Sequence, residues 1–330
     1  MGKIPLTLSC WEYDRTRALQ EGKVQVEGVE LTYLPLHVEE TFWRMLRYQE
    51  FDAAECSMSS YLMARDRGHP RLIAIPVFPS RFFRHSFIFV NTNSGIEGPK
   101  DLVGRRVGVP EYQITAAVWI RGILQHDYGV SPEKVKWFTG GAEDAGREEK
   151  LKPDLGKDID IRWIGPERTL SSMLDQGELD ALISAHIPSP FVRRSPKVKR
   201  LFPNFREVEK DYYRRTKIFP IMHAIVLREE VYEKFPWVAQ SLCKAFAESK
   251  RICEESLYKY SALKYMLAWS FADVEEEKEL FGDAFWPYGL EANRHVLETL
   301  IQYSHEQGLI KKLPELKSLF APNTLEDFKV

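Results

Sequence analysis

The chain has 330 residues, of which 44% are hydrophobic, so it is long enough for about two domains with buried cores. Its 46 Lys and Arg residues nearly balance 48 Asp and Glu residues, giving a net charge of −2. This balance argues against a general nucleic-acid-binding protein, which carries a basic excess. The four cysteines (Cys10, Cys56, Cys243 and Cys253) form no CxxC pair and fit a reducing compartment better than a disulfide framework.

The N-terminal stretch, MGKIPLTLSCWEYD, runs from one Lys directly into a strand-like segment and lacks the apolar stretch of a secretory signal. No later segment reaches the roughly 18 consecutive apolar residues that a membrane-spanning helix needs. We therefore expect a cytoplasmic protein with no membrane or nucleic-acid partner. The sequence leaves the oligomeric state open, and a homo-oligomer is one possibility.

Strand-like and helix-like segments alternate along the first third of the chain. This alternation predicts a mostly parallel sheet covered by helices. Ser57 or Ser59 would cap the second helix. The expected strands are Ile4–Cys10, Val29–Pro35, Phe51–Ser57, Leu72–Phe78 and Ser86–Asn91, and the expected helices are Glu39–Tyr48 and Tyr61–Arg65.

A second alternating series follows, interrupted by a charged, glycine-rich stretch, GGAEDAGREEKLKPDLGKD, that is typical of a surface loop. Its expected strands are Arg106–Val109, Val135–Thr139 and Leu179–Ser184, with helices at Thr115–Asp127 and Arg168–Gln176. The apolar run Ile218–Leu227 predicts a returning strand. The remaining segments, Val231–Leu257, Ala262–Phe271 and Leu290–His305, are expected to be helical.

Two α/β series and a helical tail predict two lobes around a ligand cleft. Residues 1–91 and 218–330 would form the first lobe, and residues 92–217 would form an inserted second lobe, with two crossing strands as a hinge. Ligands of open α/β sheets lie beyond the carboxyl ends of the strands, where helix N-termini point. We therefore expect the cleft to be lined by residues 11–15, 55–59, 111–115 and 186–189.

Several segments in order along nearly the whole chain resemble the 4,5-dihydroxyphthalate decarboxylase family. They are FDAAECSMSSYL, FPSRFFRHSFIFVN, DLVGRRVGVPEYQITAAVWIRGIL, ERTLSSMLDQGELDALISAHIPSPF, FPIMHAIVLREEV and FWPYGLEANRHVLETLIQYSHEQGLI. The resemblance implies a type II periplasmic-binding-protein fold that has been recruited for catalysis. It also implies decarboxylation of a hydroxylated aromatic acid, 4,5-dihydroxyphthalate giving protocatechuate.

This reaction needs no electron-sink cofactor, because each carboxylate of 4,5-dihydroxyphthalate lies para to a hydroxyl. Deprotonation of that hydroxyl pushes electrons toward the ring carbon that carries the carboxylate. Protonation of this carbon gives a dienone, which loses CO2 and becomes aromatic again. The protein must supply a base, an acid and cations for the carboxylates.

The segment SRFFRHS is the strongest candidate for binding a carboxylate, because it holds Arg81, Arg84 and His85 within five residues. Arginine binds carboxylates with two parallel hydrogen bonds, which orients them as well as neutralising them. In an extended run Arg81 and Arg84 point to opposite faces. We therefore expect only one arginine to reach the ligand, and the sequence does not decide which one.

His186 and His223 are the acid–base candidates. His186 follows the apolar run LDALISA and precedes IPSP, which marks a strand end leading into a turn. His223 interrupts an otherwise apolar strand, where it either satisfies a hydrogen bond in the core or lines the cleft. The two would approach the substrate from different sides of the cleft.

Two carboxylates complete the candidate site. Glu55 lies among small residues in DAAECS, where an unpaired charge is unfavourable, so it is either an acid or base or the partner of an arginine. Glu111 precedes a helix that Thr115 would cap, and the free N–H groups of that helix would bind a carboxylate. The further residues expected to bind substrate are Trp11, Glu12, Ser57 and Tyr112.

No HxH, HExxH or CxxC arrangement suggests a metal site, and no phosphate-binding loop or GxSxG motif is present. We therefore expect neither a metal nor a cofactor. Two alternatives to a decarboxylase remain: a solute-binding protein that holds a small or aromatic carboxylic acid without converting it, and a dehydratase acting on a cyclic acid. The fold alone does not separate them.

Overall fold

The computed structural model describes residues 2–156, 158–257, 261–284 and 286–326, and it contains two β-sheets. The first sheet has the strand order β2-β1-β3-β11-β4. Strand β1 pairs in parallel with β2 and β3, whereas β11 is antiparallel to both β3 and β4. These strands are β1 (Ile4–Ser9), β2 (Val29–Leu34), β3 (Ala53–Ser57), β4 (Leu72–Arg81) and β11 (Ile221–Arg228).

The second sheet has the order β10-β5-β9-β6-β7-β8. Four of its strands, from β9 to β8, are parallel, and β5 is antiparallel to its neighbours β9 and β10. The strands are β5 (Ile88–Asn91), β6 (Arg106–Val109), β7 (Lys136–Thr139), β8 (Ile161–Trp163), β9 (Ala181–Ile183) and β10 (Val198–Arg200). The antiparallel strand of each sheet, β11 in the first and β5 in the second, therefore follows one of the two segments that connect the sheets.

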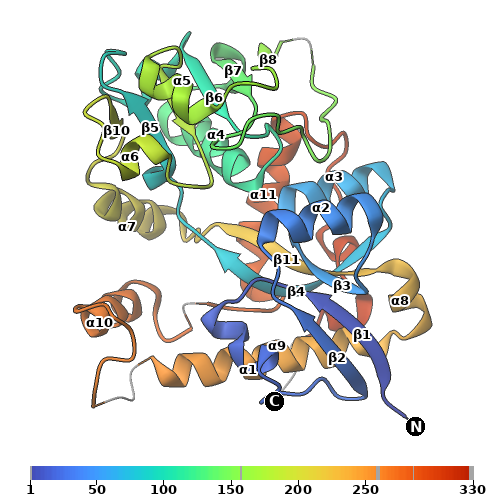
Figure 1. Cartoon of the computed structure of the whole chain (residues 1–330). Helices are drawn as coiled ribbons and strands as arrows, with labels where there is room; N and C mark the ends of the chain where they lie inside the picture. Colours follow the sequence, from blue (N-terminus) through green and yellow to red (C-terminus); the bar gives the residue numbers. More distant parts are fainter. Residues whose placement is uncertain (1, 157, 258–260, 285, 327–330) are drawn as a thin grey trace.

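Figure 1 shows the two sheets in separate bodies that are joined at the inner ends of β4 and β11. The chain passes into the second sheet after β4 and returns before β11, and these two passages contact each other. The N–H of Phe82 donates to the carbonyl of Pro220 at 3.0 Å, and the rings of Phe83 and Phe219 stack with centroids 4.8 Å apart. The expected two-lobed α/β architecture is thus confirmed.

The expected boundary of the first lobe at residue 91 is wrong by one strand. Strand β5 belongs to the second sheet, where it pairs with β9 and β10, so the first passage lies before His85. The apolar run of β5 gives no indication of its partners, because a short buried strand reads the same in either sheet.

Helices cover both sheets, and short 3₁₀ helices lie at Asp14–Thr16, His85–Phe87, Pro99–Leu102, Pro132–Lys134, Glu291–Asn293, Leu316–Leu319 and Pro322–Thr324. None of the helices in the described ranges is long and apolar enough to span a membrane. The α-helices are α1 (Arg17–Gln20), α2 (Val38–Tyr48), α3 (Met58–Arg67), α4 (Thr115–Tyr128), α5 (Leu170–Gln176), α6 (Ser189–Val192), α7 (Phe205–Thr216), α8 (Glu229–Lys234), α9 (Trp237–Ser256), α10 (Ser270–Phe281) and α11 (Arg294–Glu306).

Two of the expected helices differ from the structure. The single helix expected over Val231–Leu257 is divided into α8 and α9 around Pro236, whose ring cannot continue a helix interior. The helix expected at Ala262–Phe271 is wrong, because residues 261–269 are turns and bends and α10 begins at Ser270.

Helix α2 packs on the first lobe with one apolar face. Its buried residues Phe42, Met45 and Leu46 recur at the spacing of one helical face and pack on the first lobe. The side chain of His37 caps the helix by accepting from the N–H of Glu39 at 3.3 Å, and Glu39 and Glu40 suit the positive end of the helix dipole.

Helix α4 of the second lobe is buried from Thr115 to Leu124, because it lies against both α3 and α11. A Cβ atom at Gly122 would overlap the ring of Tyr303 on α11, so glycine permits this close approach. The indole N–H of Trp119 donates to the carbonyl of Ile221 at 2.9 Å. The two lobes therefore share a packed side at α4.

Candidate active site

Glu55 and His223 form the centre of the candidate site. They come from the neighbouring antiparallel strands β3 and β11, and Nδ1 of His223 lies 2.6 Å from Oε1 of Glu55. The ring of His223 also packs edge-on against Phe42, with centroids 4.8 Å apart. Within the described part of the chain, Nε2 of His223 has no hydrogen-bond partner, so this atom is available to a ligand.

The carboxylate of Glu55 is fully buried and accepts from several donors besides His223. The hydroxyl of Tyr13 donates to it at 2.6 Å, the N–H of Trp11 at 3.1 Å and the thiol of Cys10 at 3.6 Å. Burial raises the pKa of Glu55, but His223 and these hydrogen bonds outweigh burial and hold the pKa below its usual value. Glu55 is therefore an ionised group that holds His223, and no arginine pairs with it in the described ranges.

A row of rings crosses from the first lobe to His186. Trp11 follows β1 and His37 follows β2, and their rings meet edge-on with centroids 5.0 Å apart. The His37 ring faces that of His186, which follows β9 in the second lobe, at 6.2 Å. The carboxyl ends of strands from both sheets thus face each other, as expected for the ligand side of open α/β sheets.

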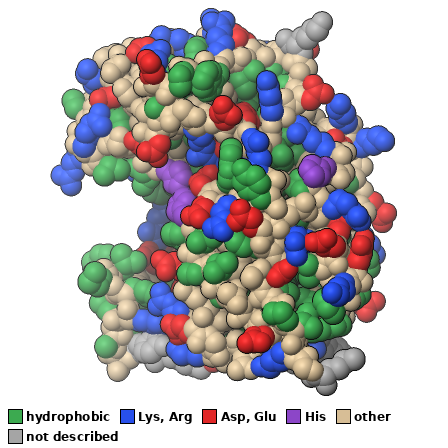
Figure 2. All heavy atoms as spheres, turned by 45° about the vertical axis from the view of Figure 1, so that its right-hand side comes forward, with side chains coloured by type: hydrophobic (Ala, Val, Ile, Leu, Met, Phe, Trp, Pro, Cys, Tyr) green, Lys and Arg blue, Asp and Glu red, His purple; other side chains and the backbone are tan. Residues whose placement is uncertain are grey.

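His186 is exposed toward this row. Partial burial of its ring lowers the pKa of His186, whereas the negative charge of Glu39 raises it. The nearby charges of His37, Arg147 and Arg84 lower this pKa further. Figure 2 shows a hollow in the surface with histidine side chains at its inner wall. The lowered pKa keeps the ring of His186 neutral at neutral pH.

The two candidate arginines have different surroundings. Arg81 is tied down by the carbonyls of Phe219 and Pro287, at 3.2 and 2.8 Å, and by the side chain of Asn293. Arg84 is only 5% exposed. Its Nε donates to the sulfur of Met222 at 3.1 Å, and its buried Nη1 has no partner among the described residues. A buried guanidinium with so few acceptors is energetically unfavourable, and an anionic ligand would compensate its charge.

Two of the expected binding residues lie in the core instead. The ring of His85 is buried against Phe202 and Tyr212, at 5.5 and 5.2 Å, and burial lowers its pKa to about 4. Tyr112 is fully buried beneath the guanidinium of Arg121, 3.7 Å from the ring centroid. The sequence could not exclude His85 and Tyr112 from the binding site, because a polar residue beside a strand end has the same local pattern whether it lies in a cleft or in a core.

The expectation that Thr115 caps helix α4 is also wrong. Glu111 is fully buried among Arg147, Lys150 and Gln113. Helix α4 has Ile114 at its N-cap position without a side-chain cap.

The hydroxyl of Thr115 joins the first lobe instead of capping α4. It lies 2.9 Å from that of Ser57, and it accepts from the N–H of Ser59 at 3.1 Å. The structure thus brings Ser57 and Thr115 together, whereas Glu12 is exposed beside the site.

Sequence reasoning did not select His37 or Glu39, and it included Tyr13 only within the cleft-lining range 11–15. His37 could have been predicted in the same way as Trp11, because it also follows a parallel strand, and ligands bind beyond the carboxyl ends of such strands. Glu39 has no comparable local signal, since its partners come from the other lobe. No group of three or more His, Cys, Asp and Glu side chains that could hold a metal occurs among the described residues.

Residues 19–147 match the model of a family described as ABC transporter, phosphonate, periplasmic substrate-binding protein. The fold resembles that of the periplasmic aliphatic sulphonate binding protein SsuA from Escherichia coli, with a TM-score of 0.53 and 13% identity over 98% of this chain and 99% of that chain. It also resembles a variant of the desulfurization enzyme DszB in complex with biphenyl-2-sulfinic acid, with a TM-score of 0.55 and 15% identity over 98% of both chains. At these identities the likeness concerns the fold.

Closer sequence relatives identify the family. A 4,5-dihydroxyphthalate decarboxylase from Comamonas testosteroni is 39% identical over 330 residues, covering 100% of both chains. A protein of the same name from Pseudomonas putida is 42% identical over 214 residues, covering 65% of this chain and 83% of its own. Because the identity extends over the full length, this chain belongs to the 4,5-dihydroxyphthalate decarboxylase family.

Proposed function

We propose that this protein decarboxylates 4,5-dihydroxyphthalate to protocatechuate without a cofactor. The observation that carries the proposal is the 39% identity over the whole chain to the Comamonas testosteroni decarboxylase. The site contains groups suited to the chemistry, namely a histidine paired with a buried carboxylate, a second histidine across the cleft and an unpaired buried arginine.

The surroundings of the two histidines support different roles. Glu55 holds Nδ1 of His223, so Nε2 is the ring nitrogen that can deliver a proton to the ring carbon. His186, with its lowered pKa, is suited to accept the proton of the para hydroxyl. The bond to the carboxylate then breaks, its electron pair restores the aromatic ring, and CO2 leaves. His186 returns the proton to the phenolate, and His223 is recharged from solvent.

Glu55 acts through His223 and is therefore a positioning residue in this scheme. Both of its oxygens are already occupied by donors from Tyr13, Trp11, Cys10 and His223, which leaves little capacity for a substrate proton. A carboxylate in this position fixes the orientation and the tautomer of the ring, as the third group of a catalytic triad does.

Substrate binding is assigned to Arg84 and to a set of aromatic and polar side chains around the cleft. The buried guanidinium of Arg84 would pair with a substrate carboxylate, and burial lowers its pKa only to about 9, so it stays charged at neutral pH. Trp11 offers a ring surface, and Ser57, Thr115 and Glu12 would contribute hydrogen bonds around the substrate. Arg81 has its own acceptors and is assigned to holding the passage between the lobes.

The division into lobes belongs to the same proposal. One lobe would comprise the first sheet with the C-terminal helices, the other the second sheet, and the passages around Phe82 and Pro220 would act as the hinge. A cytoplasmic location agrees with the four cysteines, which are all free and buried.

Incubating the purified protein with 4,5-dihydroxyphthalate tests the proposal, with release of CO2 and formation of protocatechuate as the measurements. In heavy water one deuterium should appear at the ring carbon that lost the carboxylate. Phthalate, which lacks the hydroxyls, should bind without reacting, because no phenol can push electrons into the ring. Binding of 4,5-dihydroxyphthalate without turnover would instead support a solute-binding protein.

A further inference from the structure

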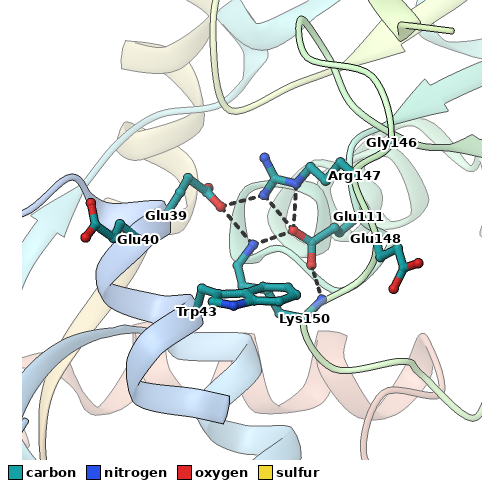
Figure 3. A pocket seen from close by; sticks show the side chains of 8 residues that line it. All are labelled: Glu39, Glu40, Trp43, Glu111, Gly146, Arg147, Glu148 and Lys150. Atoms are coloured by element: carbon teal, nitrogen blue, oxygen red, sulfur yellow. Dashed lines mark hydrogen bonds and ion pairs between the residues drawn. The ribbon is translucent and has the colours of Figure 1, made fainter. Parts of the chain in front are cut away.

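An ion-pair network joins the two lobes at one edge of the cleft. Figure 3 shows Glu39 on α2 pointing toward Arg147 and Lys150, which lie on the loop between β7 and β8, with Glu111 behind them. Nζ of Lys150 lies 2.8 Å from Oε2 of Glu39 and is also bonded to Oε1 of Glu111. Arg147 likewise bonds both carboxylates, with Nε 2.9 Å from Oε1 of Glu111. Glu39 is the member from the first lobe.

The network is partly buried and balanced in charge. Glu111 is 0% and Lys150 4% exposed, whereas Glu39 and Arg147 are 28% and 26% exposed. Two carboxylates and two cations share these contacts, so each buried charge has an opposite charge beside it, which offsets the cost of burial. Burial raises the pKa of Glu39, but Lys150 and Arg147 hold it down at about 2, so Glu39 is ionised at neutral pH.

Glu39 connects this network to the candidate active site. It lies in the first turn of α2, two residues after His37, and its N–H donates to Nδ1 of His37. The ring of His37 in turn faces His186 across the cleft at 6.2 Å. Any force that holds this first turn against the second lobe therefore also holds the two histidines together.

We propose that Glu39 is a positioning residue that clamps the first turn of α2 to the second lobe and so favours the closed, substrate-binding arrangement of the cleft. The inference rests on the proposed function for its substrate, but the contacts themselves do not depend on it. Without the carboxylate of Glu39, Lys150 and Arg147 still pair with Glu111 inside the second lobe. The second lobe thus keeps its internal ion pairs and loses only its link to α2.

A clamp of this kind has a specific kinetic signature. If the closed arrangement is populated only in part, the measured affinity falls by that fraction, whereas the saturated complex remains closed and reacts at a similar rate. We therefore expect Glu39→Ala to raise KM for 4,5-dihydroxyphthalate about tenfold and to change kcat less than threefold. The dissociation constant of phthalate, measured by calorimetry, should rise to the same extent.

The chain provides a matched control in Glu40→Ala. Glu40 is the next residue of the same first turn, and among the described residues it pairs with Arg44 of its own helix alone, at 2.9 Å. Both variants remove one acid from the same helix end, so the loss of dipole stabilisation is common to both. Glu40→Ala should leave KM and phthalate affinity within twofold of the wild type.

X-ray scattering of the unliganded proteins provides a measurement that needs neither substrate nor turnover. Glu39→Ala should have a larger radius of gyration than Glu40→Ala and the wild type. Unchanged phthalate affinity and an unchanged radius of gyration in folded Glu39→Ala would overturn the clamp, as would equal effects of the two variants. A wild type that binds phthalate but releases no CO2 from 4,5-dihydroxyphthalate would contradict the proposed function while leaving this comparison valid.

Discussion

Arg84 donates from Nε to the thioether sulfur of Met222 at 3.1 Å, and this is its only hydrogen bond within the described ranges. A thioether is a weak acceptor, so the buried guanidinium retains most of its capacity to bind an anion. The aromatic rings of Phe82 and Phe87 lie 4.8 and 5.1 Å from its central carbon and support the charge without neutralising it. This relationship distinguishes Arg84 from Arg81.

Replacing Arg84 with Met should impair binding without impairing folding. We expect Arg84→Met to raise KM at least tenfold, because a bidentate pair with a substrate carboxylate is lost. The free energy of unfolding should stay the same or increase by about 1 kcal/mol, because an unpaired buried charge is removed. Steady-state kinetics and urea unfolding check the two expectations.

Arg81→Met serves as the contrasting variant. It should lower the free energy of unfolding by about 2–4 kcal/mol, because three acceptors lose a charged donor that is itself buried, while KM of the folded protein stays near that of the wild type. If Arg84→Met destabilised the fold as strongly and left KM unchanged, Arg84 would be a structural residue.

His223→Asn tests the proton donor. Asparagine retains hydrogen bonding to Glu55 but transfers no proton at useful rates, so we expect kcat to fall about 10²-fold or more. Phthalate should still bind, as measured by calorimetry. A folded His223→Asn protein with wild-type kcat would exclude His223 and move the role to another group at the cleft.

The pH dependence of kcat/KM tests His186 as the base. A base must be deprotonated, so activity should fall as the pH drops through the pKa of His186, which lies below the usual value of a histidine. In His186→Asn the remaining activity should be lower and should lack this acidic limb. Retention of the same limb in the variant would assign it to another group.

Glu149 predicts a pH-dependent stability. Burial raises its pKa to about 7, Oε1 accepts from the N–H of Tyr112, and the buried Oε2 has no partner in the part of the chain that the structure describes. Because the pKa is higher in the folded state, protonation of Glu149 stabilises the fold below about pH 4.5, and this contribution disappears as the pH rises through 7. Glu149→Gln should therefore raise the free energy of unfolding by about 2 kcal/mol at pH 8 and have little effect at pH 4.

The control for this prediction is the exposed neighbour Glu148. Denaturant unfolding of Glu148→Gln should follow the wild type at both pH values. An equal gain in both glutamine variants at pH 8 would show that general charge reduction, and not burial of Glu149, is responsible.

Local sequence patterns predicted most of the longer elements of this fold. Apolar runs such as the one at β11 and the helical spacing of α2 depend on residues within one element, so they can be read without knowing its neighbours. Strands β8 and β10 have three residues each and are defined by the strands beside them. Helix α7 has only two buried residues, Glu209 and Tyr212, and most of its residues are charged, so its apolar pattern is weak.

The residue types that could carry the chemistry are evident from the amino-acid sequence, whereas the contacts among them depend on the tertiary fold. Glu55 and His223 were recognisable as polar residues within apolar strands, but only the pairing of β3 with β11 places them 2.6 Å apart across 168 residues of chain. The roles of Arg81, Arg84 and Glu111 depended likewise on acceptors and cations from distant segments. A side chain's charge and hydrogen bonds depend on its partners in space, and a local pattern does not contain them.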